Sequence, residues 1–126
     1  MKGSRVDLPV TLETKEVKIQ EAVWGDIHVS FETYQARFDV TPLLKGLPDN
    51  LDQCPHWGYV LRGEFRNRYK SGQEEVVKAG SAYFVGPGHT TIVEAGTELV
   101  EFSPNELFQK TMEVIGRNFE ALQAKK

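Results

Sequence analysis

The sequence lacks the features that define several large classes of protein. Its single cysteine, Cys54, excludes a disulfide within the chain and fits a reducing compartment, so we expect a cytoplasmic protein. No apolar run approaches the roughly 18 residues that a membrane-spanning helix needs. The N-terminal residues also lack the apolar segment of a signal peptide. The sequence therefore predicts no association with a membrane.

An excess of charge of one sign is also absent. Lysine and arginine together number 15 and aspartate and glutamate 18, which gives a net charge of −3. Such a chain has no electrostatic reason to bind nucleic acid. No phosphate-binding loop or serine triad stands out, and no nucleotide or organic cofactor is implied. With 40% apolar residues, we expect the 126 residues to form one domain, residues 1–126.

What the sequence does contain is a series of short strands. Alternating or apolar stretches are separated by turn residues about every eight to twelve positions, with no helical pattern between them. This spacing predicts an all-β, antiparallel sandwich or barrel over about residues 15–103. The alternation changes at Tyr34, whose parity is opposite to that of Phe31, and a bulge or a move to a second sheet would explain this. His28 lies on the polar face of its strand, so we expect it at the surface.

The C-terminal part has a helical period instead. Ser103 and Glu106 have the spacing of a capping box, which predicts a helix over about residues 104–123. One apolar stripe follows at helical spacing: Phe108, Met112, Ile115, Phe119 and Leu122. The stripe can pack on the barrel or form the seam of a dimer, and we expect a homodimer.

The chain is organised around the stretch from Cys54 to Phe65. It predicts a buried strand that begins at His56 and ends in a glycine turn at Gly63. Both faces of this strand carry large apolar groups, so we expect Trp57 and Tyr59 to lie in the core.

These residues resemble a known family. His56, separated from Gly63 by six residues, resembles the second half of the first cupin motif, and the segment 79–89 resembles the second motif, which ends in His89. The resemblance covers about residues 26–103. It implies a small, double-sheeted, jelly-roll-like β-barrel with its site in the mouth of the barrel.

The sequence departs from the metal-binding cupin pattern of His-x-His, glutamate and a later histidine. Aligned through Gly63, His56 takes the glutamate position. The histidine pair would fall at Asn50 and Asp52, or at 49 and 51. In the second motif the usual histidine position is Thr91. His89 lies two residues earlier, on the same face of an extended strand.

Two histidines and one further ligand would suffice for a metal site. We expect His56 and His89 to be the catalytic residues and to bind a divalent ion such as zinc, iron, manganese or nickel, together with Asp52 or Cys54. The residues expected to line the pocket and bind substrate are Tyr34, Phe38, Asn67, Tyr69 and Thr91.

Three functions remain open from the sequence. The first is a metal-dependent enzyme acting on a small polar metabolite, for which the cupin resemblance implies dioxygenase, isomerase, lyase or epimerase chemistry. The second is a metal-free enzyme with His56 or His89 as general base. The third is a module that binds or senses a small molecule without turnover.

Overall fold

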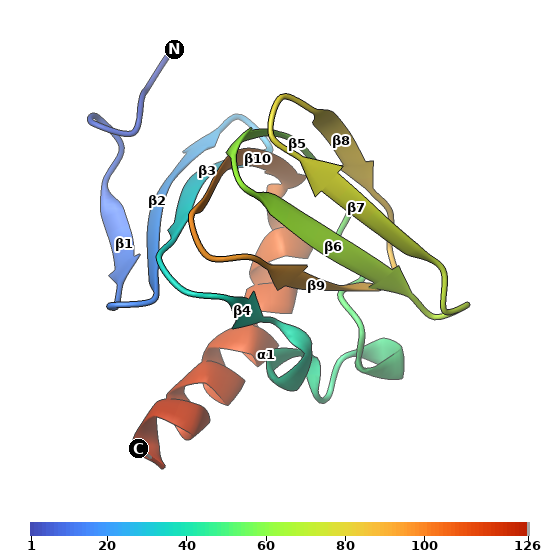
Figure 1. Ribbon diagram of the computed structural model, residues 1–126. Coiled ribbons are helices and arrows are strands. Elements are labelled where there is room, and N and C mark those ends of the chain that lie inside the picture. Colours follow the sequence, from blue (N-terminus) through green and yellow to red (C-terminus); the bar gives the residue numbers. More distant parts are fainter. Residues whose placement is uncertain (126) are drawn as a thin grey trace.

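The computed structural model describes residues 1–125, whose strands form two antiparallel sheets that face each other (Figure 1). The elements are β1 (Val10–Glu13), β2 (Val17–Trp24), β3 (Ile27–Tyr34), β4 (Phe38–Asp39), β5 (His56–Arg62), β6 (Glu64–Tyr69), β7 (Glu74–Lys78), β8 (Ala82–Val85), β9 (His89–Val93), β10 (Thr97–Pro104) and α1 (Asn105–Ala124), with short 3-10 helices η1 (Thr41–Leu44) and η2 (Pro48–Asn50).

The two sheets differ in size. One has six strands in the order β1-β2-β3-β10-β5-β8, and the other has four in the order β4-β9-β6-β7. Both are antiparallel throughout, and one long helix follows the last strand. The fold class predicted from the sequence is confirmed. Within residues 1–125, neither this helix nor the short ones are long and apolar enough to cross a membrane.

The core lies between the sheets. Val60 and Leu99 from the larger sheet meet Phe65 and Val93 from the smaller one, and all four are at most 4% exposed. Apolar surface removed from water in this way is the main favourable term in folding. The two sheets are joined directly at Gly63, which has a φ of +76° and lies so close to Thr97 that any side chain there would collide with it.

The inward face of β3 is polar, which overturns the expectation that His28 lies at the surface. His28 is 3% exposed, and its Nε2 lies 2.7 Å from Glu21 Oε1. Its ring also stacks on Phe108 of α1, with ring centroids 3.6 Å apart. A polar side chain can be buried when it finds such partners, and the alternating pattern alone does not tell which face is buried.

The change of alternation at Tyr34 marks a move between sheets. β3 pairs without a register shift along its whole length, so it contains no bulge. Tyr34 simply continues the inward face, and the chain then crosses to the smaller sheet, where Phe38 pairs with Val93.

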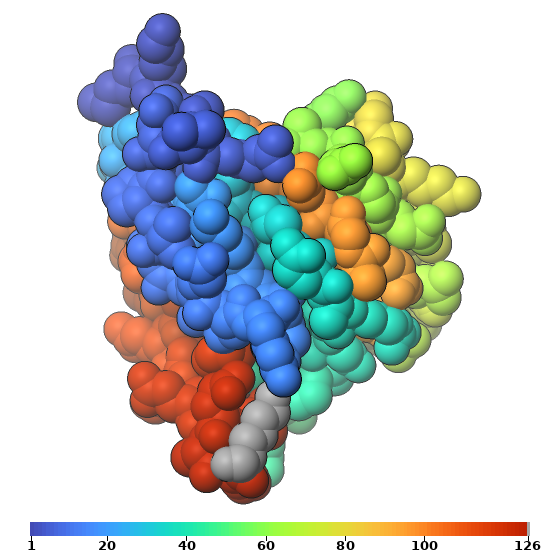
Figure 2. Space-filling model, turned by 60° about the vertical axis from the view of Figure 1, so that its left-hand side comes forward, coloured from blue at the N-terminus to red at the C-terminus, as the bar shows by residue number. Residues whose placement is uncertain are grey.

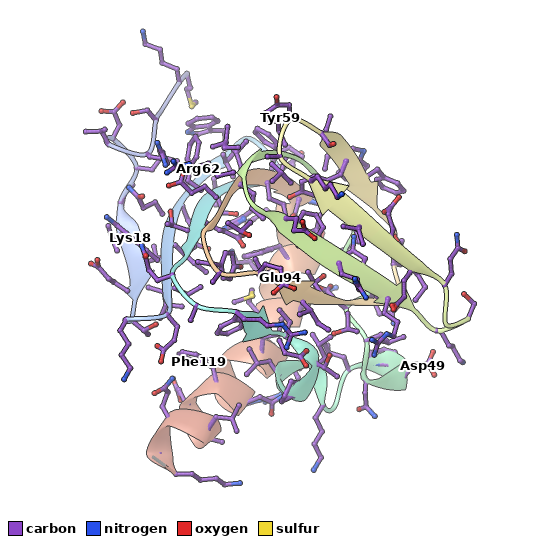
Figure 3. The ribbon with its side chains drawn as sticks, in the orientation of Figure 1. Lys18, Asp49, Tyr59, Arg62, Glu94 and Phe119 are labelled. Atoms are coloured by element: carbon purple, nitrogen blue, oxygen red, sulfur yellow. The ribbon has the colours of Figure 1, made fainter. Side chains whose placement is uncertain are left out.

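The outward face of β5 is apolar but exposed. Trp57 and Tyr59 are 47% and 42% exposed, so the expectation that they lie in the core was wrong. Tyr59 points away from the barrel (Figure 3), and Trp57 packs against Phe84 on the same surface. Both faces of this strand carry large apolar groups, but within residues 1–125 only the inward face is covered.

Helix α1 lies across one end of the sandwich, next to η1 (Figure 2). It begins at Asn105, but the predicted capping box does not form, because Ser103 still belongs to β10 and no side chain caps the helix. Four residues of the apolar stripe of α1, Phe108, Met112, Ile115 and Phe119, line a cavity, whereas the fifth, Leu122, is 40% exposed. Asn118 ties the helix down, since its Nδ2 donates to the carbonyl oxygens of Leu43 and Lys45 at 2.7 and 2.8 Å.

We expect Asn118→Ala to lower the free energy of unfolding by about 1–2 kcal/mol, because two carbonyl groups lose their donor. Urea denaturation measures this. Gln109→Ala is the matched control, since Gln109 donates only to Asn105 at an exposed position on the same helix. Equal and small effects of both variants would contradict the anchoring role of Asn118.

Candidate metal centre

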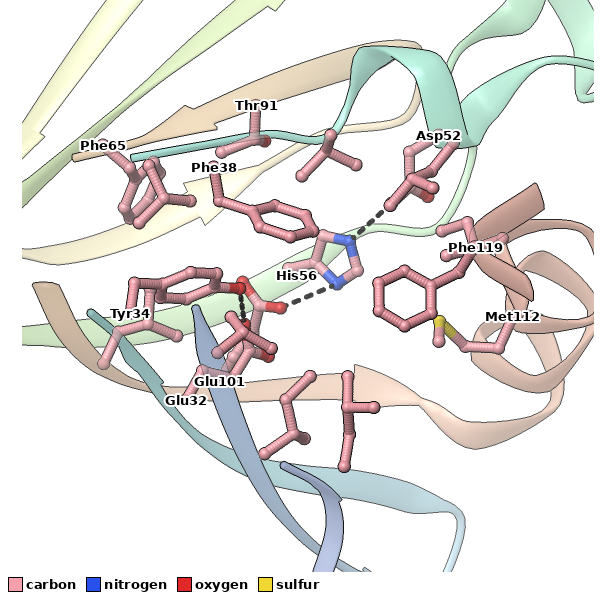
Figure 4. Close-up of a pocket in the computed structure, with 18 of the residues that line it drawn as sticks. Glu32, Tyr34, Phe38, Asp52, His56, Phe65, Thr91, Glu101, Met112 and Phe119 are labelled. Atoms are coloured by element: carbon pink, nitrogen blue, oxygen red, sulfur yellow. Dashed lines mark hydrogen bonds and ion pairs between the residues drawn. The ribbon is translucent and has the colours of Figure 1, made fainter. Parts of the chain in front are cut away.

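Three buried side chains converge at one end of the space between the sheets. Figure 4 shows two of them, with His56 facing Asp52. His56 is the first residue of β5, His89 is the first residue of β9, and Asp52 lies in the connection before β5. Asp52 Oδ2 lies 3.2 Å from His56 Nε2 and 3.6 Å from His89 Nε2. One ligand atom from each residue lies within 4.8 Å of the other two, so this group could hold a metal ion.

The backbone fixes Asp52 against the start of β9. The amide of Asp52 donates to the His89 carbonyl at 2.8 Å, and the amides of Gly88 and His89 both donate to the Asp52 carbonyl. Asp52 Oδ1 accepts a further hydrogen bond from the Cys54 amide at 2.8 Å. Two residues that are distant in sequence, Asp52 and His89, are thereby held in one register, which leaves Oδ2 directed at the histidines.

The hydrogen bond of His89 determines which of its nitrogens carries a proton. Nδ1 lies 2.7 Å from the carbonyl oxygen of Gly86, which can only accept, so Nδ1 is the donor. Burial lowers the pKa of His89, which favours the neutral ring. In that form Nε2 is an acceptor, and its lone pair faces the carboxylate of Asp52.

His56 is held on both ring nitrogens. Nδ1 lies 2.7 Å from Ser103 Oγ and 3.6 Å from Glu101 Oε2, and Nε2 faces Asp52. Burial alone would lower the pKa of His56, but Glu101 and Asp52 outweigh it and raise the pKa to about 9. Burial also opposes ionisation of Asp52, but His56 outweighs it and the pKa of Asp52 is lowered. Without a metal, His56 is therefore an imidazolium between two carboxylates.

A third carboxyl group, that of Glu32, lies next to Glu101, on the side away from Asp52, His56 and His89, which we call the metal group. Glu32 accepts hydrogen bonds from Tyr34 at 2.6 Å and from Ser30 at 2.7 Å. Burial and the nearby Glu101 raise the pKa of Glu32 to about 7. The sequence did not indicate Glu32 and Glu101 as residues of the site, and its pattern predicted Ser103 to be a helix cap. Their strands alternate as a solvent-facing strand would, and only the pairing of β3 with β10 brings these groups together.

The metal group opens into a cavity of about 210 Å³ with mainly apolar walls. Of the residues expected to bind substrate, Tyr34, Phe38 and Thr91 line it. Asn67 does not; it is fully buried and accepts a hydrogen bond from Thr91 at 2.8 Å. Tyr69 also lies outside the lining, with its ring centroid 6.5 Å from that of His89.

Cys54 is not part of the converging group. Its Sγ points to the carbonyl of Pro55 at 3.5 Å, and the side chain is 1% exposed. Burial, with the nearby carboxylates of Asp52 and Glu101, raises the pKa of the Cys54 thiol to about 12. A thiol that stays protonated is a poor metal ligand, so Asp52 fits the third position better.

The raised pKa of His56 predicts a pH dependence of stability in protein freed of metal with a chelator. A pKa that rises from 6.5 to about 9 on folding stabilises the protein fully below about pH 6.5, and this contribution is lost as the pH rises through 9. We expect roughly 3 kcal/mol of unfolding free energy to be lost in this window. Urea denaturation of the wild type and of His56→Gln measures it; equal pH slopes in the two proteins would contradict it.

Comparisons with known proteins identify the fold. No protein-family model matches the sequence, and no curated protein matches it. An RmlC-like cupin from Shewanella frigidimarina is similar in structure, with 17% identity, 81% of this chain and 88% of that chain covered, and a TM-score of 0.57. The polyketide cyclase RemF from Streptomyces resistomycificus follows with 15% identity, 83% and 79% covered, and a TM-score of 0.58.

A variant of the oxalate decarboxylase OxdC from Bacillus subtilis is also similar, with 16% identity, 81% of this chain and 28% of that chain covered, and a TM-score of 0.55. The chain has the cupin fold, as the two motifs predicted. At these identities the likeness concerns the fold alone.

Proposed function

We propose that this protein binds one divalent metal ion through Asp52 Oδ2 and the Nε2 atoms of His56 and His89. The observation that carries this proposal is the contact between Asp52 Oδ2 and His89 Nε2, 3.6 Å apart. Both atoms are acceptors when His89 is neutral, because its proton is on Nδ1. Two buried acceptors that face each other repel unless a cation lies between them.

The donor set supports a catalytic type of metal site. Two imidazole nitrogens and one carboxylate oxygen suit zinc, iron, manganese or nickel, and three protein ligands leave positions open for a small molecule. When bound, such an ion would polarise an oxygen of that molecule or activate water or dioxygen. The neighbouring residues support this role, because the Gly86 carbonyl orients His89 and Ser103 orients His56 through Nδ1.

Glu32 supports an enzyme rather than a binding protein without turnover. Its carboxyl group faces the same cavity as the metal group, and its pKa is about 7. A carboxyl group with a pKa near neutral pH can both give and take a proton. We therefore propose that Glu32 exchanges a proton with the molecule in the cavity, and that Tyr34 and Ser30 hold its two oxygens in place.

A metal-free binding protein is the alternative function. The observation that favours it is the position of His56, whose two nitrogens are satisfied by Asp52 on one side and by Ser103 and Glu101 on the other. An imidazolium held in this way needs no metal. Analysis of bound metal separates the two functions.

We expect wild-type protein, purified without an affinity tag or chelator, to contain close to one equivalent of metal by elemental analysis. His56→Gln, His89→Gln and Asp52→Asn should each remove it, because two protein ligands alone hold a divalent ion weakly.

Cys54→Ala is the control for this experiment, and it should keep the metal, since Cys54 points elsewhere. If Cys54→Ala lost the metal and Asp52→Asn kept it, the third ligand would be the Cys54 thiol rather than the Asp52 carboxylate. A wild type that contains no metal and takes up none when it is added would contradict the proposal.

We expect Ser103→Ala to weaken metal binding roughly tenfold or more, measured by competition with a chelator, because Nδ1 of His56 loses its nearest partner. Ser30→Ala is the matched control on the neighbouring strand. Ser30 is equally buried, but it contacts Glu32 rather than a histidine. The metal affinity of Ser30→Ala should therefore stay near that of the wild type.

Homodimer formation and a cytoplasmic location stay predictions. Four residues of the apolar stripe of α1 line the cavity, whereas the fifth, Leu122, is 40% exposed. The exposed apolar side chains of Trp57, Tyr59 and Phe84, on the outward face of the larger sheet, are the surface that we propose for the dimer contact.

A further inference from the structure

We infer that the part of a ligand buried beside the metal group (Asp52, His56 and His89) is largely apolar and about the size of one ring with short substituents. It carries oxygen atoms for the metal along one edge and no charged group elsewhere. This inference rests on the proposed metal function, and it narrows the small polar metabolite predicted from the sequence. It follows from three properties of the cavity: the nature of its walls, the sign of its charges and its size.

The walls are mainly apolar, and most of their polar side chains lie along one line. The larger sheet, the smaller sheet, η1 and α1 all contribute apolar side chains to the lining. The polar atoms form a connected line from Asp52 through His56 and Glu101 towards Glu32 and Tyr34 (Figure 4). A ligand that matches these walls is apolar over most of its surface, because a polar body would lose its hydrogen bonds to water without replacement.

The charges in the cavity disfavour an anionic ligand. Among residues 1–125, no lysine or arginine lines it, whereas Glu21, Glu32, Asp52 and Glu101 do. Sites that bind carboxylates or phosphates use arginine or lysine for that purpose. A metal ion would offset the charge of Asp52 at one end, but a second anionic group on the ligand would meet only carboxylates and apolar side chains.

The cavity is partly open to solvent, so its size sets how much of a ligand is buried. An apolar cavity of about 150 Å³ binds benzene in another protein, and the cavity here is about 210 Å³. It thus holds a single ring or a short branched chain together with a donor group. Met112 and Phe119 of α1 form part of the wall near His56 (Figure 4), so the helix takes part in selecting the ligand.

The test compares three compounds that share one chelating group. Isothermal titration calorimetry on the zinc-loaded protein would measure acetohydroxamic acid, benzohydroxamic acid and 4-carboxybenzohydroxamic acid. We expect benzohydroxamic acid to bind at least about tenfold more tightly than acetohydroxamic acid, because its ring is buried against the apolar walls. The added carboxylate should remove most of that gain. Equal binding of the first two compounds, tighter binding of the third, or no binding of any would overturn the inference.

Variants of α1 provide the control. Phe119→Ala should reduce the preference for benzohydroxamic acid several-fold, whereas Leu122→Ala should not, because Leu122 lies outside the lining and is 40% exposed. Circular dichroism verifies that both variants fold. An equal preference in all three proteins would contradict the role of the helix.

The same titrations without zinc separate the two proposals. If the protein takes up no metal but still prefers benzohydroxamic acid to acetohydroxamic acid, the metal function fails and the apolar ligand class stands. If zinc binds but the preference is absent, the metal function stands and the ligand class fails.

Discussion

The candidate site depends on one carboxylate that two histidines share. Asp52 Oδ2 faces the Nε2 atoms of both His56 and His89, and backbone hydrogen bonds between Asp52 and His89 hold this arrangement. Each histidine has a separate partner on its other nitrogen, so neither ring is free to turn away. The three groups are thus positioned in advance, and little reorganisation is needed for a cation to replace the proton on His56.

The two histidines and the barrel could be predicted because their evidence is local. Turn spacing indicated the sheets, and the positions of His56 and Gly63 matched a known motif. The alignment through Gly63 also set Asp52 in place of a histidine, and the structure brings Asp52 to that group.

The rest could not be predicted, because it depends on partners far away in the chain. His28 and Glu32 alternate with apolar residues as a solvent-facing strand does. Their inward direction is favourable because of partners such as the ring of Phe108 for His28 and the hydroxyl of Tyr34 for Glu32. Ser103 shows the same limit. The spacing from Ser103 to Glu106 is that of a helix cap. Ser103 instead belongs to β10, which ends at Pro104, and the Ser103 hydroxyl contacts His56.

Charge balance connects the metal group with the ligand class. Three carboxyl groups that line the cavity, those of Asp52, Glu101 and Glu32, lie along one line, and within residues 1–125 the imidazolium of His56 is the cation beside them. Glu32 relieves part of this charge because its pKa rises to about 7. A divalent ion that displaced the proton of His56 would add one net positive charge and balance the remaining carboxylates. A further anionic group of the ligand, away from the metal, would disturb that balance in a medium of low dielectric, whereas a neutral group would leave it intact.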